Sequence, residues 1–301
     1  PGGDASGPTQ TGPTPTAPET AYLIDLNTGE MTPLPKSIAG NFGYAVSPDR
    51  TMVAYSSHTG TPQIFIASLD GTDVQQVTHD RRWAGEPDWS PDGAAIAYTS
   101  ASVFAGPHYA GDGDVSNIFV LDLATGETSQ VTNEKPMTET CVACGPQGAA
   151  YPQFSPDGAS IVYLAHRGDN RSECWPGCYG LQIVPVTGGK SVLLVGGAGP
   201  GRLSPDGSTL AVLCGYRLDG GLCIAHADGT NLRVLVRSPS WAPTWSPDGT
   251  RIAYVNVENI PQATVFVVDV ATGETTFVAE GTQSPDWLDD HTLIIENFGR
   301  G

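Results

Sequence analysis

A tetrapeptide, Ser-Pro-Asp-Gly, recurs along the chain and constrains its fold more than any other feature. Four intact copies occur, a near copy ends in arginine, and a degenerate sixth copy is placed by the tryptophan before it. The copies begin at Ser47, Ser90, Ser155, Ser204, Ser246 and Leu288. Their spacings of 43, 65, 49, 42 and 42 residues predict a repeat of about 42 residues with two insertions.

A second turn signal recurs in phase with the first. Six glycines, each preceded by threonine or aspartate, are Gly29, Gly71, Gly126, Gly188, Gly229 and Gly273. Glycine supplies the positive φ that tight hairpin turns require. The stretches between the two signals are rich in β-branched residues, as in 251–255 and 264–270. Each repeat therefore predicts four short antiparallel strands.

Four antiparallel strands repeated about every 40 residues are typical of one blade of a β-propeller. Residues 22–29 match the second half of a repeat, and residues 285–295 match the first half. We therefore expect an all-β, six-bladed propeller as a single domain over residues 21–301, with its last blade closed by strands from both termini. An open solenoid would instead need polar capping units at its ends.

The repeat has a recognisable consensus, Pro-x-Trp-Ser-Pro-Asp-Gly followed by Ile-Ala-Tyr, which is clearest at 87–98 and 243–254. It resembles the WD-like repeats of the TolB-type β-propeller family, and the resemblance spans about residues 20–298. The resemblance implies a six-bladed propeller, often extracytoplasmic, that binds proteins or ligands. The α/β domain that precedes the propeller in TolB has no counterpart here, so the role of TolB in the Tol–Pal system is not carried over.

The charge of the chain limits the classes of partner that it could bind. Its 32 acidic and 14 basic residues give a formal charge of -18. Such a surface repels a phosphate backbone, so nucleic acid is not expected as a partner, whereas a cation or a basic protein is compatible. No run of 18 apolar residues occurs. Membrane contact would thus come only through a tether upstream of residue 1.

Residues 1–20 differ in composition from the rest of the chain. They contain five Pro, five Thr and four Gly and no large apolar residue, which predicts a disordered, extended linker. Such a linker joins a folded domain to a removed signal peptide or to a membrane anchor, or it is the remnant of an unrelated linker. We expect a monomer that is secreted or on the cell surface. A lipoprotein, a freely secreted protein and a receptor ectodomain all stay open.

The cysteines support that location. They are even in number and lie in or beside Gly-rich stretches, at Cys141, Cys144, Cys174, Cys178, Cys214 and Cys223. Disulfides are the favoured use. The alternatives are a four-cysteine zinc site, because the first pair has CxxC spacing, and free thiols. A hairpin placement predicts a bond between Cys214 and Cys223. The connectivity of the other four is left open.

Equivalent positions in a propeller converge on its axis, and this predicts a polar channel. Two positions before each turn serine, four of the six side chains are charged or amide. With the neighbouring Glu86, the candidate residues of the channel mouth are Glu86, Asp88, Gln153, Arg202, Thr244 and Asp286. The mouth could bind a small polar ligand or a cation, or hold only water.

The loops that lead into the innermost strands and the loops between second and third strands emerge on one face. The insertions at 99–117, 133–150 and 166–180 fall there, so we expect this loop-rich face to carry function. Three tryptophans outside the repeat register could contact a protein partner or a sugar on this face: Trp83, Trp175 and Trp241.

Metal binding and catalysis are weaker hypotheses. Asp112, Asp114 and Asn117 resemble part of a calcium loop, but the bidentate glutamate that would complete it is absent. No cofactor is therefore expected, calcium being the only candidate. The main functional hypothesis is an extracytoplasmic binding propeller. The alternatives are the ectodomain of a membrane sensor and a propeller lyase or hydrolase that uses histidines and axial carboxylates, with candidate residues His58, His108 and His166.

Overall fold

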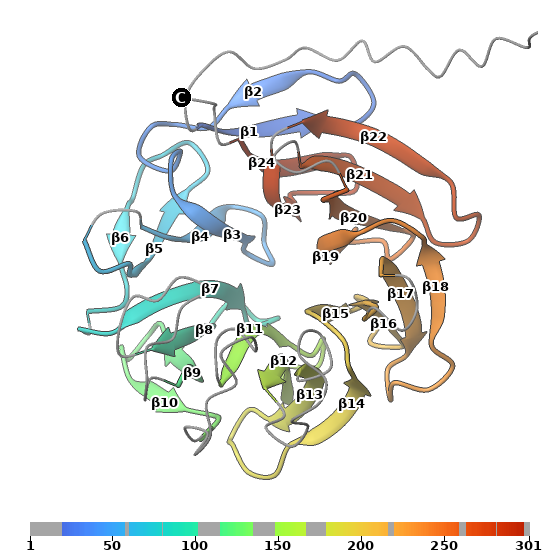
Figure 1. Cartoon of the computed structure of the whole chain (residues 1–301). Helices are drawn as coiled ribbons and strands as arrows, with labels where there is room; N and C mark the ends of the chain where they lie inside the picture. The colour runs from blue at the N-terminus through green and yellow to red at the C-terminus, as the bar shows by residue number, and fades with distance from the viewer. Residues whose placement is uncertain are drawn as a thin grey trace, which may run out of the picture.

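The structure is a computed structural model, and it describes residues 20–57, 60–79, 81–101, 115–134, 148–166, 179–215, 220–258, 263–280 and 282–297. Six four-stranded antiparallel sheets are arranged in a ring, as Figure 1 shows. The predicted six-bladed β-propeller is confirmed. The described residues contain no helix, and hence none that is long and apolar enough to cross a membrane.

Blades are numbered in chain order, with strands given from the axis outward. Blade 1 contains β3 (Phe42–Val46), β4 (Met52–Ser56), β5 (Ile64–Ser68) and β6 (Gln75–Gln76). Blade 2 contains β7 (Trp83–Trp89), β8 (Ala95–Ala101), β9 (Asn117–Asp122) and β10 (Thr128–Gln130). Blade 3 contains β11 (Ala149–Phe154), β12 (Ser160–His166), β13 (Tyr179–Pro185) and β14 (Val192–Gly196).

The second half of the ring follows the same plan. Blade 4 contains β15 (Gly201–Leu203), β16 (Thr209–Leu213), β17 (Leu222–His226) and β18 (Arg233–Val236). Blade 5 contains β19 (Ser240–Trp245), β20 (Arg251–Asn256), β21 (Thr264–Asp269) and β22 (Thr275–Glu280). Blade 6 contains β23 (Thr282–Trp287), β24 (Thr292–Asn297), β1 (Thr20–Asp25) and β2 (Met31–Pro33).

Blade 6 is closed by both ends of the chain, as predicted. Strand β1 pairs with β24 in an antiparallel register that runs from Thr20 opposite Asn297 to Asp25 opposite Thr292. The N-terminal strands thus occupy the two outer positions of a sheet whose inner strands come last in the sequence. This pairing makes the sheet continuous and leaves no gap in the ring.

Each Ser-Pro-Asp-Gly segment forms the turn between the first and second strands of its blade. In blade 5 the Ser246 hydroxyl donates to Asp248 Oδ1 at 2.6 Å and accepts a hydrogen bond from the Arg251 N–H at 2.9 Å. Asp248 also accepts from the Thr250 N–H at 3.0 Å. The same serine-to-aspartate bond occurs in the other four turns of this type. The repeated serines are therefore turn residues.

The hydrophobic core lies between neighbouring blades. In β8 the side chains of Ile96 and Tyr98 pack with residues of blade 1, and the side chain of Ala97 packs with residues of blade 3. All three are nearly or fully buried. Successive side chains of a strand point to opposite faces. The Ile-Ala-Tyr part of the repeat therefore holds a blade against both of its neighbours.

The predicted bond between Cys214 and Cys223 is confirmed. It joins the residue after β16 to β17 with a Cα–Cα distance of 5.6 Å. The other cysteines, at 141, 144, 174 and 178, lie outside the described residues, so their connectivity stays as predicted from the sequence.

Loss of this disulfide should lower the free energy of unfolding by about 2 to 3 kcal/mol, because the bond closes a short loop in the unfolded chain. We expect the single variants Cys214→Ser and Cys223→Ser and the double variant to lose similar amounts in denaturant titrations, since either change removes the whole bond. Losses that add in the double variant would show that the two cysteines act independently.

Candidate functional site

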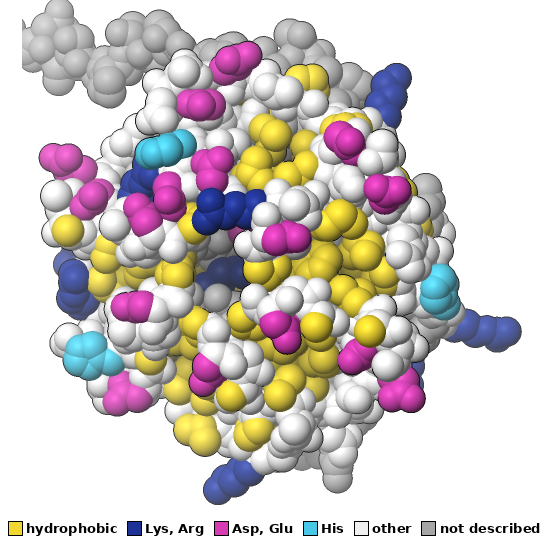
Figure 2. Space-filling view, turned by 180° about the vertical axis from the view of Figure 1, so that it is seen from behind, with side chains coloured by type: hydrophobic (Ala, Val, Ile, Leu, Met, Phe, Trp, Pro, Cys, Tyr) yellow, Lys and Arg dark blue, Asp and Glu magenta, His cyan; other side chains and the backbone are white. Residues whose placement is uncertain are grey.

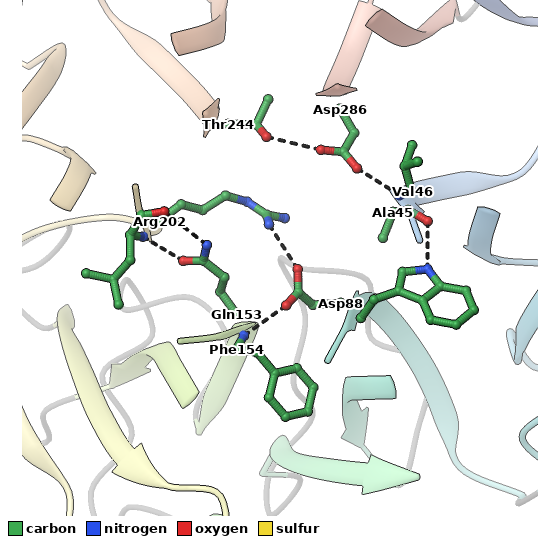
Figure 3. Close-up of polar contacts among 10 residues, drawn as sticks. Ala45, Val46, Asp88, Gln153, Phe154, Arg202, Thr244 and Asp286 are labelled. Atoms are coloured by element: carbon green, nitrogen blue, oxygen red, sulfur yellow. Dashed lines mark hydrogen bonds and ion pairs between the residues drawn. The ribbon is translucent and has the colours of Figure 1, made fainter. Parts of the chain in front are cut away.

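The side chains two positions before the turn serines converge on the axis, as the sequence predicts (Figure 3). Asp88, Gln153, Arg202, Thr244 and Asp286 line one cavity of about 300 Å³ with the small Ala45. Prolines of the Ser-Pro-Asp-Gly turns line the same cavity, so it opens on the face formed by these turns. Figure 2 shows that face, with hydrophobic side chains around a central hollow and acidic side chains spread across the surface. We call this space the turn-face cavity.

Three of these axial side chains connect one blade to the next. Each accepts a hydrogen bond from the backbone N–H of the residue before the turn serine in the following blade. The pairs are Asp88 with Phe154 N at 2.8 Å, Gln153 with Leu203 N at 2.7 Å and Asp286 with Val46 N at 2.9 Å.

The other three blade interfaces have a different bond at the same level along the axis. At these interfaces the first residue of the turn is preceded by a tryptophan. Its indole N–H donates to the backbone carbonyl of the axial residue in the preceding blade. The pairs are Trp89 with Ala45 O at 3.0 Å, Trp245 with Arg202 O at 3.0 Å and Trp287 with Thr244 O at 3.1 Å.

The two kinds of bond are complementary around the ring. Ala45, Arg202 and Thr244 do not offer a carboxylate or amide oxygen, and each is followed by a blade that supplies a tryptophan. Where the axial residue has such an oxygen, the next blade has Phe, Leu or Val instead. Every blade interface thus has one bond of these two kinds next to the axis. We call these six bonds the axial clasps.

Arg202 is the cation of the turn-face cavity nearest the two axial aspartates. Its Nη1 donates to Asp88 Oδ1 at 3.0 Å, and its guanidinium points between Asp88 and Asp286 in Figure 3. Burial raises the pKa of both aspartates, while the charge of Arg202 opposes that rise. The Thr244 hydroxyl donates to Asp286 Oδ1 at 3.1 Å. The polar side chains around the axis therefore bind one another.

Asp88→Ala should lower the free energy of unfolding by about 2 to 3 kcal/mol, because it leaves the buried Phe154 N–H without its acceptor. Asp286 remains to compensate Arg202. Thr244→Ala is the matched control, since it removes one axial hydrogen bond but no clasp, and its loss should stay below about 1.5 kcal/mol. Equal losses in denaturant titrations would contradict a special role for the clasp.

A second cavity lies at the opposite end of the innermost strands, on the loop face. Its volume is about 90 Å³, and we call it the loop-face cavity. Its walls include residues four positions before the turn residue, where the inner strands of five blades carry a β-bulge. The bulged residues all have positive φ: Gly43, Glu86, Tyr151, Ala242 and Ser284. Such a backbone is strained for a residue with a side chain, and it redirects these side chains.

Glu86 is fixed in the wall of this cavity. Its Oε2 accepts a 2.7 Å hydrogen bond from the Thr99 hydroxyl and a 2.8 Å bond from the Tyr151 N–H of the next blade. Burial raises the pKa of Glu86 above its usual value, and these hydrogen bonds oppose the rise. The carboxyl group thus adds a second link between blades 2 and 3.

Aromatic side chains form the apolar part of the loop-face cavity. The rings of Tyr151 and Trp241 meet edge to face, with centroids 5.8 Å apart and planes at 83°. Tyr44 also lines the cavity, and its hydroxyl donates to the Ile38 carbonyl at 2.9 Å. Sequence reasoning had named Glu86 and Trp241 but missed Tyr44 and Tyr151. The position four residues before each turn serine was the signal that could have found Tyr151.

Glu296 makes the corresponding link where the ring closes. It is 4 % exposed, and its Oε1 accepts a hydrogen bond from the Gly43 N–H of blade 1 at 2.8 Å. It lies on β24 opposite Ala21 of β1. Burial raises the pKa of Glu296 to about 8. Glu296 is therefore protonated in the folded protein at pH values where it is ionised in the unfolded chain.

The stability of the protein relative to Glu296→Gln should consequently fall as pH rises from about 4.5 to about 8. The folded state holds a proton that the unfolded state releases over this range, so rising pH favours unfolding until the carboxyl ionises in both states. The glutamine keeps an acceptor for Gly43 and does not titrate. Melting temperatures of both proteins between pH 4 and 9 test this, and parallel curves would contradict it.

The remaining predicted site residues are placed as follows. Trp83 is buried beside Gly85, where its ring leaves no room for a Cβ. The Asn117 side-chain oxygen accepts bonds from the Thr132 hydroxyl at 3.0 Å and the Glu134 N–H at 2.7 Å. Outside the described residues lie Trp175, Asp112, Asp114, His58 and His108.

His166 ends β12 on the loop side of blade 3. Its ring meets that of Tyr179 edge to face, with centroids 5.2 Å apart. Within the described parts of the chain, no group of three or more His, Cys, Asp or Glu side chains is arranged to hold a metal ion. Of the three histidines that the catalytic hypothesis names, His166 is therefore the one that the structure describes.

Comparisons with known proteins agree with the fold. No family model matches the chain. The Tol-Pal system protein TolB of Alcanivorax borkumensis is 35 % identical over 81 residues, which cover 25 % of this chain and 19 % of that protein. The curated relatives are therefore matched over less than a fifth of their own length.

Solved structures match over nearly the whole chain. The putative TolB from Agrobacterium tumefaciens has a TM-score of 0.74 and 18 % identity, and the match covers 94 % of this chain and 99 % of that one. An oligogalacturonate lyase in complex with manganese has a TM-score of 0.54 and 20 % identity, over 88 % of this chain and 73 % of that one. At this identity the likeness concerns the fold, which is that of a TolB-like six-bladed propeller.

Proposed function

We propose that this protein is an extracytoplasmic binding propeller that recognises a protein or a small polar ligand at its loop-face cavity. One observation carries the proposal: the loop-face cavity combines the aromatic rings of Tyr44, Tyr151 and Trp241 with the half-buried, hydrogen-bonded carboxyl group of Glu86. Aromatic side chains beside a few fixed polar groups are the usual composition of binding pockets and of interface centres.

The position of this cavity supports binding at the loop face. It lies at the end of the blades where the three longest connections of the chain begin, those after β8, β10 and β12, and variable loops on a rigid scaffold commonly carry recognition. The wall of the cavity contains β-bulges in place of regular strand pairing, and their residues have positive φ. Such features cluster at functional sites. The turn-face cavity is larger, but its axial polar side chains are engaged in the clasps or bonded to one another.

Two observations support an extracytoplasmic location. The Cys214–Cys223 disulfide requires an oxidising compartment to persist. The chain also resembles TolB in fold and in part of its sequence. The similarity in fold to an oligogalacturonate lyase supports a propeller lyase as the second candidate function. Among the described residues, His166 is the histidine that such an enzyme would use.

Selection of a phage-displayed peptide library on the immobilised protein tests the proposal. We expect enriched peptides whose affinity falls at least about tenfold in Trp241→Ala, because loss of a central aromatic anchor costs 1.4 kcal/mol or more. Arg50→Asn is the control, since it changes the turn-face cavity and asparagine tolerates the positive φ of this position. If Arg50→Asn weakens peptide binding and Trp241→Ala does not, the binding site lies on the turn face and the proposal is wrong.

A further inference from the structure

The loop-face cavity brings two perpendicular aromatic rings and a carboxyl group into one small space. We propose that it binds an ammonium group, supplied either by a lysine side chain or free amino terminus of a partner protein or by a small amine. This inference rests on the proposed function, because it names the chemistry of the ligand at the same cavity.

The aromatic walls suit a cation. A ring attracts positive charge to its face, and tryptophan and tyrosine do so most strongly. Because the planes of Tyr151 and Trp241 lie at 83°, the two rings form a corner and not a flat stack. Tyr44 adds a third ring to the lining, held in place by its hydrogen bond to the Ile38 carbonyl. A compact cation in this corner can contact more than one ring.

The carboxyl group of Glu86 supplies the counter-charge. It is held by the Thr99 hydroxyl and the Tyr151 N–H, so its position is fixed without a ligand. An ammonium ion beside it would favour the ionised form, which burial disfavours. Carboxylate and cation would thus stabilise each other through a charge-assisted hydrogen bond.

Arg202 also lines the loop-face cavity, and its charge must be considered. Its guanidinium is bonded to Asp88 and lies near Asp286, so it is already matched. With Glu86, three carboxyl groups stand against the guanidinium of Arg202 and that of Arg50, which lines only the turn-face cavity. The whole chain carries a formal charge of -18, which would draw cations toward the protein. The balance of charge therefore favours a cation over an anion.

The rim of the cavity disfavours anions for a further reason. Four of the lining residues directly after the bulge position are Pro87, Pro152, Pro243 and Pro285. Proline has no N–H, so these positions offer no backbone donor to an anion. The volume of about 90 Å³ is far below the roughly 300 to 1,000 Å³ of a pocket for a drug-sized ligand. The cavity suits one small group and not an extended ligand.

Calorimetric titration with choline and with its uncharged isostere, 3,3-dimethylbutan-1-ol, tests the proposal. We expect saturable binding of choline, and binding of the isostere at least about tenfold weaker, since only the charge differs. Glu86→Gln should weaken choline binding at least about tenfold while keeping the acceptor for Tyr151. Glu296→Gln is the matched control, because Glu296 also bonds a bulge N–H, and it should leave binding within about twofold.

Two further probes identify the source of the ammonium group. Nα-acetyl-lysine methylamide and butylamine are titrated in parallel with choline. Tighter binding of the lysine derivative supports a partner protein, and tighter binding of choline or butylamine supports a small amine. Equal affinity for the isostere, no effect of Glu86→Gln, or no saturable binding of any amine would each overturn the proposal.

The library peptides separate this inference from the proposed function. If their binding depends on Trp241 but survives replacement of every lysine by norleucine and acetylation of the amino terminus, the ammonium site is wrong and the binding propeller stands. If binding of the peptides does not depend on Trp241, the proposed protein-binding role fails. The choline titration then decides the ammonium site by itself.

Discussion

The axial clasps are the interaction on which the rest of the propeller depends. Strands within a blade are joined by continuous backbone hydrogen bonds, whereas neighbouring blades meet mainly through side chains and share few backbone hydrogen bonds, such as that from Ala149 N to Ser116 O. Next to the axis, the clasp at each interface sets the position of one inner strand along the axis relative to the next inner strand. The hydrophobic contacts between blades do not fix such a position, because they have no direction. Both cavities inherit their shape from this register.

The clasps also explain why the repeat is imperfect in a regular way. Trp89, Trp245 and Trp287 occur where the axial residue of the preceding blade has no carboxylate or amide group. Asp88, Gln153 and Asp286 occur where the following blade lacks tryptophan. A consensus of the repeat would hide this relation, because each position looks variable when it is taken alone. The variation belongs to pairs of neighbouring blades.

The fold could be predicted from the sequence because its signals are local. Turn residues recur with a fixed period, and the complementary halves at the two ends indicate how the ring closes. The convergence of residues such as Asp88 and Arg202 followed from their equivalent positions. The loop-face cavity could not be found in the same way. The aromatic corner joins Tyr151 and Trp241 across blade 4, whose short inner strand β15 carries no bulge, and no periodic signal reports a contact between blades 3 and 5. The bonds that engage Asp88 and Glu86 likewise depend on distances that the sequence does not contain.

Closure of blade 6 by both termini has a consequence for how the chain folds. Blades 1 to 5 are built from consecutive residues, so each can form soon after it is synthesised. Strands β1 and β2 must wait for β23 and β24, which are the last strands of the propeller in the sequence. Until then β1, which pairs with β2, has one unpaired edge, and such edges promote association between nascent chains. Formation of the complete ring is therefore a late, long-range event, because it pairs residues 20–25 with residues 292–297.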